Sequence, residues 1–256
     1  MTDARHPSTS QDDMDIKPNL EQQEGYYTER WNAFAFANKL DLARVTAVLE
    51  TLSHIGFDDP PEICDLGCGA GWATSIFGHF GKTTGVDLSD TTQAAQRYPN
   101  CAFLSANILE WDAPKEAFDV VVSLEVIEHI ERPLQAKYVE VAHKLLRPGG
   151  HFIITTPNAN TMRAMAKGGR EWSNQPLEEW LTPSELRAVL ATRFDVRDVR
   201  SIIPEFGVRG SYRVMNSGKI RGAMQAIGRG DAWESMQLRA MYGLHLVAHA
   251  QKSRRG

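Results

Sequence analysis

Five short apolar runs alternate with helical segments between residues 62 and 156, and this alternation constrains the fold more than any other feature. The expected helices cover 71–80, 90–97 and 133–146. Strands that are separated by helices form right-handed crossovers, so the pattern predicts an α/β fold with a parallel sheet and helices on both faces. The expected strands are EICDL at 62–66, TTGVDL at 83–88, CAFL at 101–104, FDVVVSL at 118–124 and HFIITT at 151–156.

The segments around this core indicate one domain with additions. Residues 1–20 are polar and have almost nothing to bury, so we expect a disordered tail before a domain over 21–256. Two more strands, FDVRDVRSII and MYGLHLVAHAQ, follow a helix that starts near Thr182. The segment between these two strands is rich in Arg and Gly, and we expect an insert or lid over 204–238.

Charge and hydropathy exclude several classes of protein. The net charge of -4 gives no general attraction to nucleic acids or anionic membranes. No apolar run approaches the roughly 20 residues of a membrane span, and the N-terminal residues do not resemble a signal peptide. The three cysteines form no CxxC pair, which suits a reducing compartment. We therefore expect a cytoplasmic protein without a transmembrane segment.

The segment DLGCGAG at 65–71 places three glycines between an expected strand and an expected helix. Glycines at such a turn let the backbone approach a ligand closely and direct helix N-terminal amides toward it. The spacing Gly67-x-Gly69-x-Gly71 differs from the GxGxxG of dinucleotide sites. A tight turn without a ligand would also explain the glycines if they stood alone.

Polar residues at the ends of the next two expected strands support a ligand-binding role for the glycines. Asp87 closes a strand about 20 residues on, where a carboxylate can accept hydrogen bonds from both ribose hydroxyls. Asn107 and Ile108 follow the third strand, where an amide and an apolar neighbour can hold an adenine. In this order along the chain, the features predict a nucleoside cofactor across the strand ends.

The stretch LEVIEHI at 124–130 places Glu125, Glu128 and His129 directly after a buried strand. If a helix begins just past the strand, the three are spaced i, i+3, i+4 and share the face above the strand ends. Three interpretations remain open: acidic residues charging a helix N-terminus beside a packed histidine, His129 as a general base, or all three as ligands of a hard divalent cation such as Mg²⁺.

Residues 60–160 resemble the class I S-adenosylmethionine-dependent methyltransferases. EICDLGCGAGWAT resembles their first motif, GVDLS the ribose-binding acid, SANILEW the adenine segment and FDVVVSLEVIEHI the fourth motif, and LLRPGGHFIITTPN is similar to their next loop and fifth strand. The EVIEH variant resembles the ubiquinone-biosynthesis O-methyltransferases, their relatives acting on sugars and polyketides, and the small-RNA 3′-terminal 2′-O-methyltransferases. The resemblance implies a Rossmann-like seven-stranded, mostly parallel sheet with an antiparallel last strand and an N-terminal helical lid.

The resemblance also implies S-adenosylmethionine as the cofactor and assigns its contacts by position. The ubiquinone and small-RNA relatives use the EVIEH motif with a metal ion, but the RNA enzymes supply a further histidine after the fifth strand. Residues 155–183 contain none, so a metal site here would need Glu178, Glu179 or water as well. The residues implied to bind the cofactor are Asp65, Gly67, Gly69, Gly71, Asp87, Leu88, Asn107, Ile108 and Leu124.

Aromatic and basic residues outside the core are candidates for binding the acceptor. The insert is basic in an acidic chain, and arginines suit a phosphate-bearing acceptor, although a solvated loop or a membrane-contacting helix would also fit. The candidate acceptor contacts are Tyr26, Arg30, Trp172, Arg209 and Arg213.

We therefore expect an S-adenosylmethionine-dependent O-methyltransferase that acts on a hydroxyl of a small or lipid-linked molecule of sugar, nucleotide-sugar, quinone or polyketide type. An RNA 3′-terminal 2′-O-methyltransferase is the first alternative, disfavoured by the net charge and the missing histidine. A non-catalytic S-adenosylmethionine-binding partner protein is the second.

Overall fold

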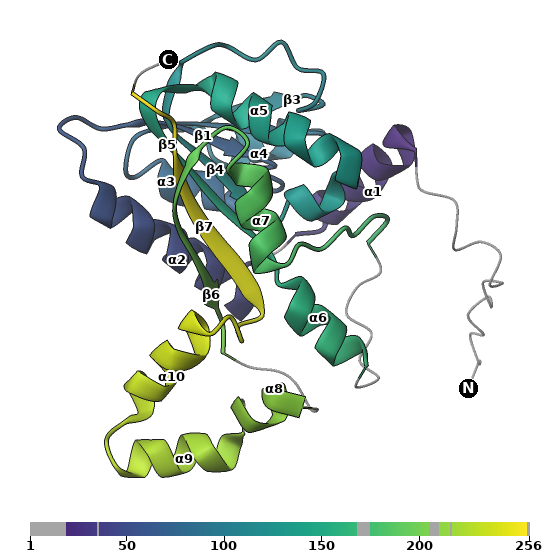
Figure 1. The fold of residues 1–256 in the computed structure, drawn as a ribbon. Coiled ribbons are helices and arrows are strands. Elements are labelled where there is room, and N and C mark those ends of the chain that lie inside the picture. The colour runs from purple at the N-terminus through teal and green to yellow at the C-terminus, as the bar shows by residue number, and fades with distance from the viewer. Residues whose placement is uncertain (1–18, 35, 168–174, 205–209, 216, 255–256) are drawn as a thin grey trace, which may run out of the picture.

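A seven-stranded sheet forms the centre of the computed structural model, which describes residues 19–34, 36–167, 175–204, 210–215 and 217–254 (Figure 1). The strand order is β3-β2-β1-β4-β5-β7-β6. All pairings from β3 to β5 are parallel, and β7 is antiparallel to both of its neighbours, which confirms the expected sheet. The strands are β1 Glu62–Leu66, β2 Lys82–Asp87, β3 Ala102–Ser105, β4 Phe118–Leu124, β5 Leu146–Pro157, β6 Asp195–Ile202 and β7 His245–Gln251.

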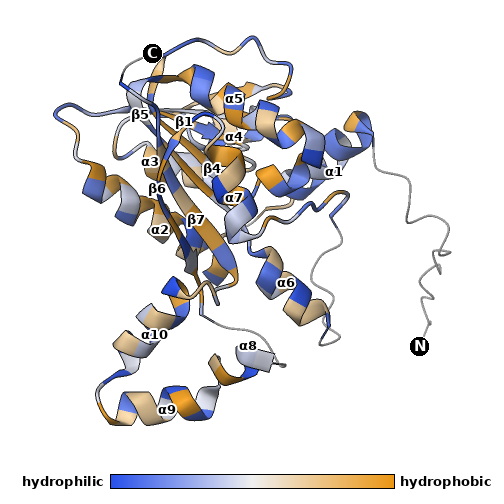
Figure 2. Cartoon of the chain, in the orientation of Figure 1, coloured by the Kyte–Doolittle hydropathy of each residue, from blue (hydrophilic) through white to orange (hydrophobic). Residues whose placement is uncertain are grey.

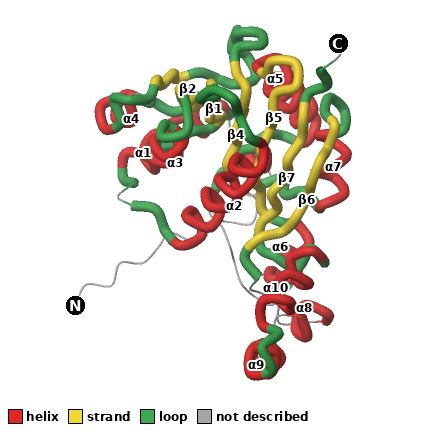
Figure 3. The backbone as a smooth tube through the Cα atoms, turned by 90° about the vertical axis from the view of Figure 1, so that its left-hand side faces the viewer, coloured by secondary structure: helices red, strands yellow, loops and turns green. Residues whose placement is uncertain are grey.

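Helices surround the sheet, as the tube drawing shows with the strands in yellow (Figure 3). The α-helices are α1 Leu20–Asn32, α2 Lys39–Ile55, α3 Trp72–Phe77, α4 Thr92–Arg97, α5 Gln135–Leu145, α6 Ala159–Ala166, α7 Pro183–Leu190, α8 Gly210–Met215, α9 Gly218–Ala226 and α10 Gly230–Arg239. Two 3₁₀ turns, Ile127–His129 and Arg132–Leu134, follow β4.

Alternate residues of the central strands pack into two separate cores, one on each face of the sheet. Ile63 and Val120 face the cluster that α2 and α3 complete, whereas Cys64 and Val121 face the cluster that α5 and α7 complete. This double burial explains the continuous apolar runs 120–122 in β4 and 152–154 in β5 (Figure 2). The strand ends, not the faces, are therefore the part of the sheet left for ligands.

Two of the helices that frame the strand ends begin with side-chain caps. Asn38 accepts hydrogen bonds from the backbone of α2, and the Asp41 carboxylate reaches back to the Asn38 amide. Thr182 and Glu185 make the same reciprocal pair at α7, with Pro183 at its first position, which confirms the expected helix start. These caps fix where both helices begin relative to the sheet.

The outer segments differ in part from the predictions. Residues 1–18 of the expected disordered tail lie outside the described residues, and Asn19 and Leu20 already cap and begin α1. The insert forms the helices α8 to α10, which lie beyond one end of β6 and β7 (Figure 1). In the described part of the chain, no helix is long and apolar enough to span a bilayer.

Candidate functional site

A cavity of about 1210 Å³ lies at the carboxyl ends of the parallel strands. Its walls include the ends of β1, β2, β4 and β5, the first residue of β7, the start of α2 and one side of α1. Ligand sites usually measure roughly 300–1,000 Å³, so this cavity has room for a cofactor and a second molecule together. Residues of α1 line one side of it, whereas the described part of the insert 204–238 contributes nothing to its walls.

The glycine turn brings backbone to the cavity because side chains do not fit there. Gly67 lines the cavity, and a Cβ on it would lie 2.2 Å from Cγ2 of Val126. Gly69 lines the cavity as well. Gly71 has a positive φ of 76° and does not line it; a Cβ there would lie 2.7 Å from the Phe103 ring. The space around Gly71 is thus filled by the packing of the turn against β3, and its contact with the cofactor stays a prediction.

Two buried carboxylates stand at the ends of β1 and β2. Asp87 accepts hydrogen bonds from the amides of Gly69, at 2.7 Å, and Ser89, at 2.9 Å, so its orientation is fixed at the cavity wall. Asp65 accepts one from the Thr74 hydroxyl at 2.6 Å, while its Oδ1 has no hydrogen-bond partner among the described residues. Burial raises the pKa of Asp65 to about 7. A buried, unpaired carboxylate oxygen is a place for a cationic ligand group.

The predicted adenine contacts Leu88, Asn107 and Ile108 all line the cavity, and so does Leu124, a further predicted cofactor contact. The Leu109 amide donates to Oδ1 of Asn107 at 3.1 Å. This bond fixes the orientation of the Asn107 amide group and leaves its Nδ2 to donate to a ligand. The strand-end residues that follow one another in the sequence therefore line the same cavity.

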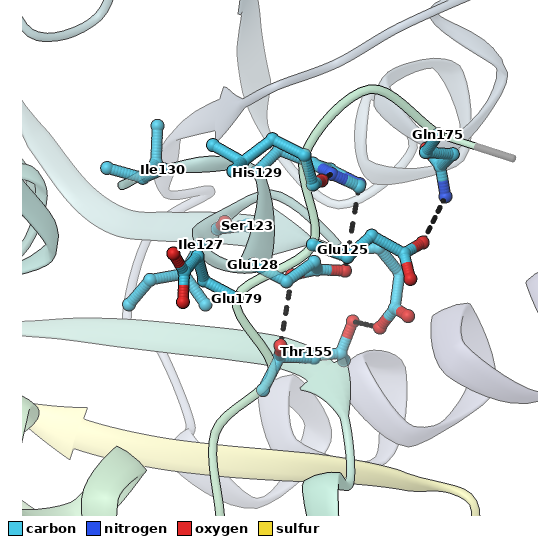
Figure 4. A network of polar contacts seen from close by, with 12 residues as sticks. Ser123, Glu125, Ile127, Glu128, His129, Ile130, Thr155, Gln175 and Glu179 are labelled. Atoms are coloured by element: carbon cyan, nitrogen blue, oxygen red, sulfur yellow. Dashed lines mark hydrogen bonds and ion pairs between the residues drawn. The ribbon is translucent and has the colours of Figure 1, made fainter. Parts of the chain in front are cut away.

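The three polar residues of LEVIEHI line the cavity, but they do not share one helical face as predicted. Glu125 has a left-handed φ of 57°, and only the following 3₁₀ turn, Ile127–His129, is helical. Left-handed backbone is uncommon for a glutamate and interrupts the helical spacing. Figure 4 shows the three side chains near one another despite this different backbone path.

Glu125 is held by groups from three other elements. Its Oε1 accepts a hydrogen bond from Thr155 of β5 at 2.8 Å. Its Oε2 lies 3.0 Å from Nη1 of Arg44 on α2 and 2.8 Å from Nδ1 of His245 at the start of β7. Burial alone would raise the pKa of Glu125, but His245 and Arg44 lower it to about 2. Glu125 is therefore a carboxylate with a fixed set of partners.

Glu128 and His129 form a second, more deeply buried pair. Glu128 is 2% exposed and accepts a hydrogen bond from Thr156 at 2.9 Å. Burial, and then the Glu125 charge, raise the pKa of Glu128 well above its usual range. Nδ1 of His129 lies 2.7 Å from the Leu177 carbonyl oxygen, which places the proton on Nδ1 and the lone pair on Nε2. Nε2 lies 4.0 Å from Glu128, and burial lowers the pKa of His129, so the imidazole is neutral at pH 7.

Tyr27 on α1 completes this part of the cavity, although no sequence pattern distinguishes it from its aromatic neighbours. Its ring centroid lies 5.6 Å from that of His129, and its buried hydroxyl has no hydrogen-bond partner among the described residues. Burial and the nearby Glu128 raise the pKa of the phenol, which therefore stays a hydrogen-bond donor.

The predicted acceptor contacts divide into three groups. Tyr26 and Arg30 line the cavity, and Arg30 donates to the Tyr26 hydroxyl at 3.1 Å. Arg213 is exposed on α8 and does not line the cavity, so its assignment is not supported by its position. Trp172 and Arg209 lie outside the described residues.

The arrangement of Glu125, Glu128 and His129 does not fit a bound metal ion. Among the described residues, no group of three or more His, Cys, Asp or Glu side chains is placed to hold one. The Glu125 carboxylate is already paired with Arg44 and His245. A cation at this position would meet a guanidinium that is always charged.

Comparison with known proteins agrees with this geometry. The family model described as a methyltransferase domain matches residues 34–204. A probable S-adenosylmethionine-dependent methyltransferase from Mycolicibacterium smegmatis is 31% identical over 152 residues, which cover 57% of each protein. A ubiquinone biosynthesis O-methyltransferase from Caulobacter sp. strain K31 is 34% identical over 150 residues, covering 51% of this chain and 57% of the relative. The chain thus matches little more than half the length of these relatives.

Among solved structures, the N-methyltransferase NodS from Bradyrhizobium japonicum, in complex with S-adenosyl-L-homocysteine, superposes with a TM-score of 0.61 at 17% identity. The superposition covers 90% of this chain and 98% of NodS. At this identity the likeness shows the shared fold.

Proposed function

This chain belongs to the methyltransferase-domain family, and we propose that it transfers a methyl group from S-adenosylmethionine to a hydroxyl oxygen of a small or lipid-linked molecule. One observation carries the choice of a hydroxyl: His129 lines the cavity as a neutral imidazole with its lone pair on Nε2. A hydroxyl must lose its proton during methylation, and such a group can take it.

The residues at the ends of β1, β2 and β3 suit S-adenosylmethionine, which supplies a methyl group already activated on a sulfonium. The unpaired Oδ1 of Asp65 is suited to the ammonium of the methionine portion. Asp87, with its carboxylate held by backbone amides, is suited to the ribose hydroxyls. Asn107 and Ile108 form a polar and an apolar contact for adenine.

The residues after β4 and on α1 act on the acceptor. Nε2 of His129 takes the proton of the acceptor hydroxyl, and general-base catalysis of this kind contributes roughly 10²–10⁴-fold. The Tyr27 hydroxyl donates a hydrogen bond to the acceptor, since nothing in the described chain uses it. Alignment of the acceptor oxygen with the methyl group is the larger contribution, because good positioning can supply roughly 7–11 kcal/mol.

The relatives support the proposal to different degrees. Ubiquinone biosynthesis O-methyltransferases are among the most similar curated proteins, and they favour an oxygen acceptor. NodS has the same fold and is an N-methyltransferase, so the fold alone does not decide the methylated atom. The proposal of an oxygen acceptor therefore rests on the base His129 and the hydrogen-bond donor Tyr27. We call the part of the cavity that these two residues line with Glu125 and Glu128 its acceptor half.

A single substitution tests the proposal. His129→Ala should lower turnover at least tenfold while the affinity for S-adenosylmethionine, measured by calorimetry, stays near that of the wild type. His54→Ala is the matched control, because His54 is an exposed histidine on α2 outside the cavity. Unchanged turnover in His129→Ala would show that His129 is not the general base, and the argument for a hydroxyl acceptor would then fail.

A further inference from the structure

Two basic side chains that lie far from LEVIEHI in the sequence, Arg44 and His245, enter the part of the cavity lined by Glu125, Glu128 and His129. Arg44 comes from α2, and its guanidinium also pairs with Asp41 one turn earlier in the helix. His245 is the first residue of β7. The Arg44 side chain is 16% exposed and that of His245 is 2% exposed, and both line the cavity. Both groups therefore belong to the site and not to the surface.

Arg44 and His245 contact the Glu125 carboxylate, which a metal ion bound at LEVIEHI would need as a ligand. Both groups lie within 3.0 Å of the same oxygen, Oε2 of Glu125, and the other oxygen accepts a hydrogen bond from Thr155. Arginine is charged at any pH that a protein tolerates, so it competes permanently with a divalent cation for this position. Like charges at contact distance repel more strongly at a partly buried position than in bulk water.

The contact with Glu125 also defines what His245 offers to a ligand. Nδ1 of His245 lies 2.8 Å from Oε2 of Glu125, which leaves the other ring nitrogen, Nε2, for a ligand. This Nε2 is buried and has no hydrogen-bond partner among the described residues. A buried imidazole nitrogen without a partner in a cavity wall is placed to form a hydrogen bond with a bound molecule.

The geometry points to a metal-free acceptor site in this chain, in which Arg44 supplies the positive charge beside Glu125 and His245, held next to Glu125, forms a hydrogen bond with the acceptor. Arg44 and His245 are thus positioning residues for an acceptor with more than one polar group. The part that concerns the acceptor rests on the proposed function, whereas the absence of a metal site does not.

The metal-free claim is tested without any acceptor. Wild-type protein saturated with S-adenosyl-L-homocysteine is titrated with Mn²⁺, and free Mn²⁺ is followed by electron paramagnetic resonance. We expect the same free signal as in buffer, for the wild type and for Glu125→Gln alike. One Mn²⁺ bound per wild-type chain and lost in Glu125→Gln would overturn the inference.

The role of the Arg44 charge is tested by turnover. Arg44→Met should lower kcat at least tenfold, with no recovery on addition of Mg²⁺ or Mn²⁺, and Arg44→Lys should keep more of the activity. Arg163→Met, an exposed arginine of α6 outside the cavity, is the matched control. Full activity in Arg44→Met, or its rescue by a divalent cation, would contradict the inference. If Arg44→Met does not fold, the Mn²⁺ titration of the wild type still decides.

The role of His245 is tested by separating KM from kcat. His245→Gln should raise the acceptor KM at least fivefold while the affinity for S-adenosyl-L-homocysteine is retained. His249→Gln is the control on the same strand, because His249 pairs with His151 outside the cavity. An unchanged acceptor KM in His245→Gln would contradict a contact between His245 and the acceptor. If the wild type methylates no hydroxyl at all, the proposed function fails, and the Mn²⁺ result stands by itself.

Discussion

Replacing Asp65 by Asn should stabilise the ligand-free protein at pH 8 and weaken its binding of S-adenosylmethionine. In the ligand-free chain, one carboxylate oxygen accepts the Thr74 hydroxyl, and the other is buried without a partner among the described residues. Burial raises the pKa of Asp65 to about 7. Relative to an ordinary value near 3.9, this rise corresponds to roughly 4 kcal/mol, at about 1.36 kcal/mol per unit.

The direction of the pH effect is set by proton binding. Between about pH 4 and pH 7 the folded chain keeps a proton on Asp65 that the unfolded chain has released. Stability therefore falls as pH rises through this window, and the full penalty is present above pH 7. Asparagine cannot ionise, but its amide would be left without a partner at a cost of about 1–3 kcal/mol. The expected net gain at pH 8 is about 1–3 kcal/mol.

Urea unfolding of the ligand-free protein at pH 5.5 and pH 8 measures this effect. The wild type should lose stability between the two pH values, and Asp65→Asn should lose less. Calorimetry should show at least a tenfold loss of S-adenosylmethionine affinity in the same variant. The exposed Asp112→Asn is the control and should match the wild type in both assays. Parallel pH dependences in wild type and Asp65→Asn, or an unchanged affinity, would contradict this role of Asp65.

Three further predictions concern the acceptor half of the cavity. Tyr27→Phe removes an unpaired donor and should raise the acceptor KM severalfold, in steady-state assays, without changing S-adenosylmethionine affinity. Burial lowers the pKa of His129, so kcat/KM should stay constant as pH is lowered from 8 to 6.5 and should decrease only at lower pH, where His129 takes up a proton. An inflection of this profile above pH 7 would contradict a neutral buried base. Glu125→Ala leaves the buried charge of Arg44 without its Glu125 partner and should destabilise the fold by about 3–5 kcal/mol in urea unfolding; a loss under 1 kcal/mol would mean that this contact is weak.

The strands of the sheet could be predicted well because burial on both faces requires runs of apolar residues, which are visible in the sequence. The expected strands at 62–66 and 118–124 coincide with β1 and β4. The strand β5 begins at Leu146, earlier than expected, because Leu146 already pairs with Phe118 of β4; RPGG then forms an irregularity with Gly149 at a positive φ of 84°, and regular pairing resumes at His151. Hydropathy reports which side chains are buried, and it does not report how polar backbone pairs.

The site was predicted in part. Strand ends meet at one edge of a parallel sheet, so Asp65, Asp87 and Asn107 could be placed together from their order alone. Arg44 and His245 could not, because nothing near either residue in the sequence indicates a contact with Glu125. Such contacts depend on how α2 and β7 pack, which local periodicity does not record. The left-handed backbone of Glu125 was likewise not readable, since glutamate is an uncommon residue in that conformation.

The methylated atom is the most direct test of the proposed O-methyltransferase activity. Wild-type protein is incubated with S-adenosylmethionine carrying a ¹³C-labelled methyl group and with separated small-molecule, lipid and RNA fractions of a cell extract. We predict an O-methyl carbon signal in the small-molecule or lipid fraction, which forms at least tenfold more slowly with His129→Ala. A label on nitrogen, a label in RNA, or an undiminished rate with His129→Ala would contradict the proposal.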